Sequence, residues 1–97
     1  GAMPSIASMI KGNKVVVFSW VTCPYCVRAE KLLHARTKDI TVHYVDKMSE
    51  GEQLRGEIYQ AYKHETVPAI FINGNFIGGC SDLEALDKEG KLDGLLS

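Results

Sequence analysis

Two cysteines separated by a proline and a tyrosine are the residues of this sequence best suited to chemistry. The stretch WVTCPYC, residues 20–26, places Cys23 and Cys26 directly after the apolar run VVVF at 15–18. Two thiols at this spacing can supply half of a zinc site, form a structural disulfide, or carry out thiol–disulfide exchange. Each of these chemistries requires different partners elsewhere in the chain.

Zinc and a structural disulfide are both disfavoured by the remaining ligand candidates. A structural zinc site requires four ligands, of which this pair would supply two. An odd total of three cysteines argues against the disulfide framework of a secreted domain. The other candidate zinc ligands are spread along the chain and include no second close pair: Cys80, His34, His43 and His64.

The expected position of the pair at the start of a helix gives a physical reason for redox chemistry. Pro24 suits the first helical position, because its φ angle is fixed and no N–H donor is needed there. Cys23 would then be the N-cap, where unpaired backbone N–H groups and the helix dipole stabilise a thiolate. Cys26, one turn later, is close enough to form a disulfide with Cys23 but less accessible. We expect Cys23 to attack, Cys26 to resolve and Tyr25 to be exposed.

The apolar pattern predicts strands that alternate with helices around this pair. Ser49 with Glu52, and Ser81 with Glu84, are capping boxes that predict where two helices begin. The dipeptide at 73–74, Asn-Gly, favours a tight hairpin turn. This order predicts an α/β domain with a small mixed sheet and helices on both faces. The expected helices are 5–11, 24–38, 49–62 and 81–88, and the expected strands are 15–18, 41–45, 66–72 and 76–77.

The composition favours a single domain without a polymeric partner. The chain has 97 residues and a net charge of −1, which gives no basic surface for nucleic acid. It has no apolar stretch of membrane-spanning length and no signal-peptide pattern, so we expect a cytoplasmic location and a monomer. Residues 1–3, Gly-Ala-Met, are expected to be an expression scar, and 4–97 to be the domain.

The second half of the chain contains features of a binding site. Gly78 and Gly79 precede a helix start, where backbone N–H groups can hold an anion. Asp82 in the first turn is placed to meet an ammonium group. A ligand with a carboxylate and an ammonium on one carbon, such as a γ-glutamyl group, would fit both. The alternative is that Ser81, Asp82 and Glu84 only cap the helix.

Three motifs in this order resemble a dithiol glutaredoxin of the thioredoxin fold, over essentially the whole chain from Ser5 to Leu96. They are CPYC at 23–26, TVP at 66–68 and GGCSDL at 78–83. The resemblance implies a thioredoxin-like fold, a four-stranded mixed sheet, a cis peptide at Val67-Pro68 and Cys23 as nucleophile supported by Pro24 and Tyr25. It implies glutathione as co-substrate, bound by Tyr25, Arg55, Thr66, Val67, Pro68, Gly79, Cys80, Ser81 and Asp82.

One position departs from the family pattern. The family usually has a lysine three residues before the first cysteine, where it binds the glycyl carboxylate of glutathione, and this chain has Trp20 there. Arg55 could take that carboxylate instead. Alternatively, the preferred thiol could lack a free glycyl carboxylate, as in glutathione conjugated to a polyamine.

The resulting prediction is a glutathione-dependent oxidoreductase that reduces protein–glutathione mixed disulfides and some protein or small-molecule disulfides. A thioredoxin-like reductase is disfavoured, because its site usually reads WCGPC and it lacks the glycine turn. A carrier of an iron–sulfur cluster is a further alternative, in which Cys23 from two subunits and two glutathiones would hold the cluster. Pro24 stiffens the loop and counts against this alternative, so we expect neither a metal nor a permanent cofactor.

Overall fold

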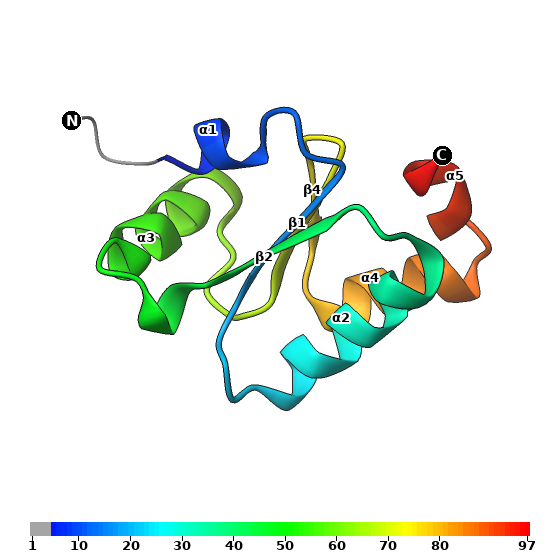
Figure 1. Cartoon of the computed structure of the whole chain (residues 1–97), viewed down its shortest axis with the longest axis horizontal. Coiled ribbons are helices and arrows are strands. Elements are labelled where there is room, and N and C mark those ends of the chain that lie inside the picture. Colours follow the sequence, from blue (N-terminus) through cyan, green and yellow to red (C-terminus); the bar gives the residue numbers. More distant parts are fainter. Residues whose placement is uncertain (1–4) are drawn as a thin grey trace.

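One four-stranded sheet organises the part of the chain that the computed structural model describes, residues 5–97; the expected scar at 1–3 lies outside these residues. The strand order is β2-β1-β3-β4. β1 is parallel to β2 and antiparallel to β3, and β3 is antiparallel to β4, which confirms the predicted mixed sheet (Figure 1). The strands are β1 (Val15–Ser19), β2 (Ile40–Tyr44), β3 (Ala69–Ile72) and β4 (Asn75–Gly78).

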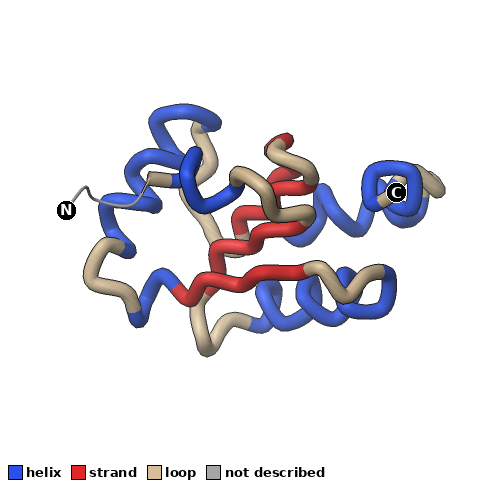
Figure 2. Tube along the Cα trace, turned by 45° about the horizontal axis from the view of Figure 1, so that its top comes forward, coloured by secondary structure: helices blue, strands red, loops and turns tan. Residues whose placement is uncertain are grey.

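Helices cover both faces of this sheet, as the alternating pattern predicts. α1 (Ile6–Ile10) and α3 (Gly51–Tyr62) pack on one face. α2 (Pro24–Arg36), α4 (Cys80–Lys88) and α5 (Leu92–Leu96) pack on the other (Figures 1 and 2). A short 3-10 turn, Val45–Lys47, joins β2 to α3. None of the helices within 5–97 combines the length and apolar character needed to cross a membrane.

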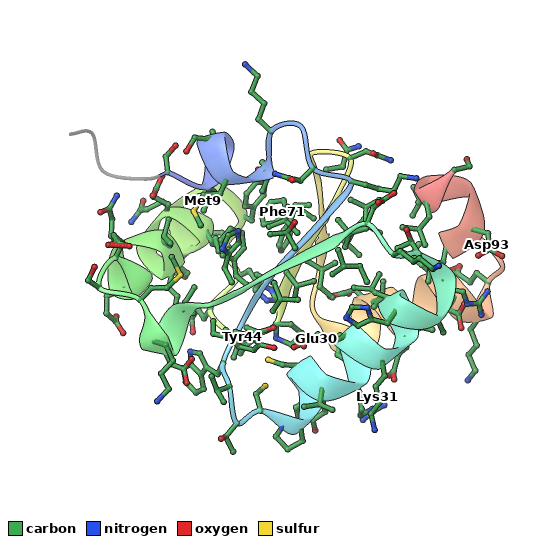
Figure 3. The ribbon with its side chains drawn as sticks, viewed as in Figure 1. Met9, Glu30, Lys31, Tyr44, Phe71 and Asp93 are labelled. Atoms are coloured by element: carbon green, nitrogen blue, oxygen red, sulfur yellow. The ribbon has the colours of Figure 1, made fainter. Side chains whose placement is uncertain are left out.

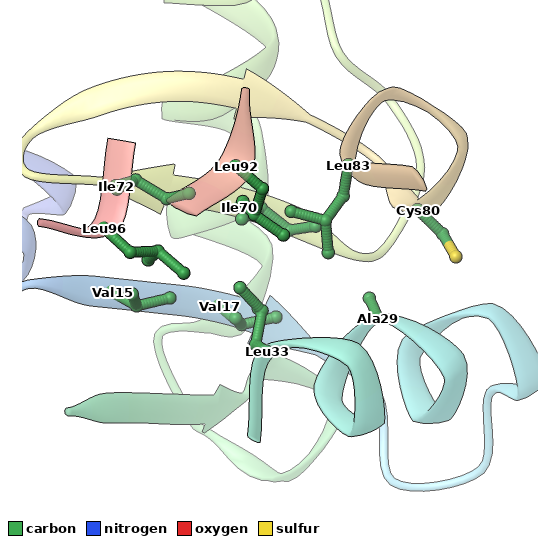
Figure 4. Close-up of a cluster of buried hydrophobic side chains, with 10 residues drawn as sticks. All are labelled: Val15, Val17, Ala29, Leu33, Ile70, Ile72, Cys80, Leu83, Leu92 and Leu96. Atoms are coloured by element: carbon green, nitrogen blue, oxygen red, sulfur yellow. The ribbon is translucent and has the colours of Figure 1, made fainter. Parts of the chain in front are cut away.

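The apolar run of β1 lies between two hydrophobic clusters, because side chains of a strand point alternately to opposite faces. Val16 and Phe18 join the cluster under α1 and α3, where Met9 and Phe71 also lie (Figure 3). The second cluster contains Val15 and Val17 and fills the space under the other three helices (Figure 4). β1 is therefore buried on both faces and fixes the start of the loop that carries Cys23.

The start of α3 differs from the prediction. Ser49 and Glu52 form no capping box: the N-cap residue is Glu50, no side chain caps the helix, and the Ser49 hydroxyl donates to the Glu50 carboxylate. Gly51 instead packs against the carbonyl of Val45, where any Cβ would collide with that oxygen. Close packing of backbone on the 3-10 turn therefore sets where α3 begins.

Strand and helix ends also differ from the predicted ranges. The predicted strand at 66–72 enters the sheet only at Ala69, because Pro68 has no N–H to donate to a neighbouring strand. The predicted strand at 41–45 gives up Val45, which begins the 3-10 turn. α2 ends at Arg36 rather than 38, with Thr37 as its C-cap.

The hairpin turn at Asn73 is confirmed, and it also holds a helix that the sequence pattern did not reveal. Asn73 and Gly74 have φ angles of 49° and 80°, as a tight turn between antiparallel strands requires. The Asn73 side-chain amide donates to the carbonyl of Leu95 in α5 at 2.9 Å. Leu92 and Leu96 of this short helix are buried in the larger cluster. Two leucines were too few to indicate a helix from sequence.

Candidate active site

Cys23 lies where the sequence predicts it, at the junction between the central strand and a helix. It follows β1 after three loop residues and is the N-cap of α2, with Pro24 at the first helical position. Its sulfur accepts a hydrogen bond from the backbone N–H of Cys26 at 3.2 Å. The side chain keeps 9% of its surface exposed. This arrangement stabilises a thiolate, because a donor and the positive end of the helix dipole both face the sulfur.

Cys26 is in a different environment, although it is only three residues away. It is fully buried, and burial raises the pKa of its thiol to about 12. The neighbouring Cys23 raises this pKa further, whereas hydrogen bonds from the Ser19 hydroxyl and the Trp20 backbone oppose the rise. All three cysteines, including Cys80, are free thiols in this structure. The pair therefore combines an accessible sulfur with one that holds its proton.

A second loop faces the Cys23 sulfur from the start of β3. The peptide bond between Val67 and Pro68 is cis, which confirms the expectation from the TVP motif. The Val67 carbonyl lies 4.0 Å from the Cys23 sulfur and accepts a weak hydrogen bond from it. Pro68 is buried. This loop therefore presents its backbone directly beside the thiol at the helix start.

A groove of about 550 Å³ extends away from this point along the start of α4. It brings together three regions that the sequence analysis singled out, the CPYC loop, the TVP loop and the glycine turn. Tyr25 is 61% exposed at one side of it. Residues that line the groove are Tyr25, His64, Thr66, Val67, Pro68, Gly79, Cys80, Ser81 and Asp82.

The start of α4 is built differently from the predicted capping box. Ser81 and Glu84 do not cap it, since the N-cap residue is Gly79 and Asp82 reaches back to accept its N–H at 2.9 Å. Gly78 has a φ angle of +122°, and a Cβ there would collide with the Asp82 carboxylate. Both glycines are thus needed for the close turn that places the Asp82 carboxylate on the groove wall. Ser81 is left exposed at the groove.

Arg55 is the one predicted contact residue that does not line this groove. Its guanidinium donates to the carbonyl of Glu65 at 2.9 Å and lies 5.1 Å from the centre of the Trp20 ring. It also approaches the Glu52 carboxylate at 3.8 Å. A neighbouring hollow of about 320 Å³ is lined by Arg55, Glu52, Glu65 and Tyr59, with Gly56. Trp20 therefore packs against the cation that would replace the missing lysine.

Four side chains near the site were not found from the sequence. His64 lines the groove, and its Nε2 is 3.0 Å from the Pro68 carbonyl. Ser19, Glu30 and Tyr44 form a hydrogen-bonded line behind Cys26. No motif marks any of them, because each belongs to a different element and is placed only by packing. Proximity to TVP was the only signal for His64.

Cys80 is the first residue of α4 and lies between the groove and the core. It is buried, and burial raises the pKa of its thiol, with the Glu84 charge adding to the rise. Its sulfur belongs to the hydrophobic cluster shown in Figure 4. Across residues 5–97, no three or more His, Cys, Asp or Glu side chains are grouped closely enough to hold a metal ion.

Comparison with known sequences supports the same grouping of residues. A family model described as Glutaredoxin matches residues 15–77. Human glutaredoxin-2, mitochondrial, is 42% identical over 87 residues, which are 90% of this chain and 53% of the relative. The chain thus spans about half the length of this relative. Glutaredoxin-C2 of Arabidopsis thaliana is 38% identical over 96 residues, covering 99% of this chain and 86% of the relative.

Solved structures share the whole architecture described above. A buckwheat glutaredoxin–glutathione complex superposes with a TM-score of 0.91 at 32% identity, covering 94% of this chain and 83% of that chain. The holo form of glutaredoxin C1 from Populus tremula x tremuloides gives 0.89 at 33% identity, covering 93% and 81%. The fold is therefore thioredoxin-like, as expected. Taken with the cysteine pair at the helix start, these matches show that the chain belongs to the glutaredoxin family.

Proposed function

We propose that this chain is a glutathione-dependent thiol–disulfide oxidoreductase that reduces protein–glutathione mixed disulfides and some protein or small-molecule disulfides. The observation that carries this proposal is the groove beside Cys23, which joins Tyr25, the cis Val67-Pro68 loop and the turn that precedes α4. The similarity to a buckwheat glutaredoxin solved with glutathione supports the same ligand.

The proposed reaction begins at the Cys23 thiolate. It attacks the glutathione sulfur of a mixed disulfide, so that a Cys23–glutathione disulfide forms and the substrate protein leaves as a thiolate. A second low-molecular-weight thiol then attacks the glutathione sulfur and regenerates Cys23. Alternatively, Cys26 attacks the Cys23 sulfur, which releases glutathione and forms the intramolecular disulfide.

The groove offers complementary groups to each part of the γ-glutamyl peptide. We propose that the backbone N–H groups after Gly79 hold its α-carboxylate, because this is the positive end of α4. The Asp82 carboxylate, fixed by its bond to Gly79, would face the ammonium group. The Val67 backbone would pair with the extended cysteinyl residue and bring its sulfur to Cys23.

Exchange of each cysteine for serine tests the assignment of roles. Cys23→Ser is expected to abolish turnover of both a glutathionylated peptide and a small disulfide, because the attacking sulfur is lost. Cys26→Ser is expected to keep turnover of the glutathionylated peptide and to lose reactions that require the intramolecular disulfide. Steady-state rates with glutathione measure both. Equal losses in the two variants would contradict the proposal.

For the glycyl end of the thiol we propose two candidates, Arg55 as carboxylate partner, or a thiol without that carboxylate, such as a glutathione–polyamine conjugate. Arg55 is held by Glu65, Glu52 and the Trp20 ring, and these contacts turn part of its charge away from the groove. The two carboxylates beside it would suit a cationic amine better than a free carboxylate. These contacts favour the conjugate.

Trp20→Lys distinguishes these two thiols. Restoring a cation beside the groove is expected to raise kcat/KM for glutathione and to leave that for a polyamine-linked dithiol unchanged or lower, since only glutathione presents the carboxylate. Both thiols are compared as reductants of one glutathionylated peptide. A variant whose preference between the two thiols equals that of the wild type would refute the conjugate.

We further propose a monomer that works in a reducing compartment without a resident cluster. Within the described residues, Cys23 is the one thiol at the mouth of the groove, and Pro24 fixes the loop that holds it. One accessible thiolate per chain does not by itself match the ligand set of an iron–sulfur cluster. Visible absorption of protein purified without oxygen would contradict this part of the proposal.

A further inference from the structure

A line of hydrogen-bonded side chains leads from the buried Cys26 thiol towards the surface, between α2 and the β1–β2 edge of the sheet. Ser19, fully buried at the end of β1, donates from its hydroxyl to the Glu30 carboxylate at 3.0 Å. Tyr44, at the end of β2, donates to the other oxygen of Glu30 at 3.2 Å. Figure 3 shows Tyr44 and Glu30 side by side.

The inner end of this line is the resolving thiol. The Ser19 hydroxyl hydrogen-bonds the Cys26 thiol and thereby opposes the rise of its pKa that burial causes. A thiol must lose its proton before it can attack a disulfide. Since the pKa of Cys26 is raised to about 12, an unaided Cys26 would hardly ever be ionised at neutral pH. The dithiol route therefore needs a group that removes this proton as the attack occurs.

The outer end of the line reaches solvent. Glu30 is half-buried, and Tyr44 is 38% exposed. Among the described residues, none of the recorded ion pairs involves Glu30, and its two oxygens accept from the hydroxyls of Ser19 and Tyr44. The Glu30 charge in turn raises the pKa of the Tyr44 phenol, which keeps that group a donor. A carboxylate in this position can accept a proton and return it to water.

We propose that Ser19 and Glu30 form a proton relay that deprotonates Cys26 during attack on the Cys23 mixed disulfide, with Tyr44 linking the relay to solvent. This inference rests on the dithiol route proposed above. Ser19 contacts the reacting thiol, and Glu30 acts through Ser19. The titratable groups that face Glu30 are Cys26 on its own helix and Tyr44 on β2.

The forward step moves two protons and one sulfur–sulfur bond. The Cys26 proton passes to the Ser19 oxygen while the Ser19 hydroxyl proton passes to Glu30, so the serine is unchanged and Glu30 becomes a carboxylic acid. The Cys26 sulfur forms a bond to the Cys23 sulfur with its freed electron pair. The bond from Cys23 to glutathione breaks, and glutathione leaves as a thiolate.

The reverse step uses the same groups. When an external thiolate attacks the Cys23 sulfur of the intramolecular disulfide, the Cys26 sulfur leaves with the electron pair of the broken bond. Glu30 in its acid form then returns a proton through Ser19 to this sulfur. The relay thus serves both oxidation and reduction of the pair.

Glu30→Gln tests the relay in the full chain. Reduced protein is mixed with glutathione disulfide, and the fluorescence of Trp20, the single tryptophan, follows the reaction. The first phase depends on the disulfide concentration and reports attack by Cys23; the second does not and reports closure by Cys26. Closure is expected to slow about 100-fold near neutral pH, a typical contribution of a general base, while the first phase keeps its rate.

The pH dependence separates a relay from a structural role. In Glu30→Gln, hydroxide has to remove the proton, so closure should accelerate about tenfold per pH unit. In the wild type it should rise less steeply, and the two rates should converge at alkaline pH. Equal closure rates and equal slopes would overturn the relay. Glu57→Gln, which removes another half-buried helical carboxylate on the opposite face of the sheet, is expected to behave as the wild type.

Ser19→Ala provides the second arm. If Glu30 acts only through Ser19, both single variants and the double variant should close at the same slow rate, whereas independent roles would multiply. Cys26→Ser should show no closure phase. A closure phase that persisted in Cys26→Ser would refute the dithiol route itself, whereas its loss there with an unaffected Glu30→Gln would refute only the relay.

Discussion

Two identical side chains, Cys23 and Cys26, acquire opposite properties within a single helical turn. Cys23 precedes the first turn, where it accepts a backbone N–H, while Cys26 points into the protein with no exposed surface. Because a buried thiolate lacks solvation, the second sulfur holds its proton. The difference between nucleophile and resolving thiol is thus a difference in solvent access.

The raised pKa of Cys26 predicts a loss of stability at alkaline pH. Its pKa is 9.0 in the unfolded chain and about 12 in the folded one, so above pH 9 unfolding releases a proton. The contribution is fully present below pH 9 and decreases between 9 and 12 by about 1.4 kcal/mol per pH unit.

Urea denaturation of the reduced protein from about pH 8 to about pH 10.5 measures this effect. Cys26→Ala is the control, because it lacks the titrating thiol but keeps the other alkaline groups. The free energy of unfolding of the wild type is expected to fall more steeply than that of the variant. Parallel profiles would mean that Cys26 is not buried as described.

Helix starts in this protein depend on close backbone contacts as much as on capping side chains. Gly51 begins α3 against the Val45 carbonyl, and Gly78 lets Asp82 reach back to Gly79 at α4. The capping pattern predicted both helices but not these starts, since it cannot register a neighbouring loop. The pattern succeeded at Cys23, where Pro24 itself fixes the first helical residue.

Two glycines of α3 provide a matched test of this conclusion. Gly51→Ala places a Cβ against the Val45 oxygen and is expected to destabilise the protein by about 1–3 kcal/mol. Gly56→Ala fills open space on the same helix and should stabilise it by about 0.5–1 kcal/mol. Thermal and urea unfolding of both variants measure the two values. Equal and opposite signs from those expected would exclude a steric role for Gly51.

At the scale of the whole molecule, the periodic pattern was sufficient for the sheet, its two covered faces and the position of the cysteine pair. It was insufficient where side chains from separate elements meet. Ser19, Glu30 and Tyr44 come from β1, α2 and β2, and no short motif links them. Arg55 was predicted to contact the ligand, but packing against Trp20 places it beside a neighbouring hollow. Motifs identify the residues of one loop, whereas three-dimensional packing selects their supporting partners.

The bond from Asn73 to Leu95 has a practical consequence. β1 runs from Val15, paired with Ile72 beside the hairpin turn, to Ser19, which leads to Cys23, so α5 and the reactive sulfur lie at opposite ends of the sheet (Figure 1). A fluorescent protein or surface anchor joined at Ser97 would therefore leave access to the sulfur open. The chain is suited to serve as the sensing module of a fused redox reporter.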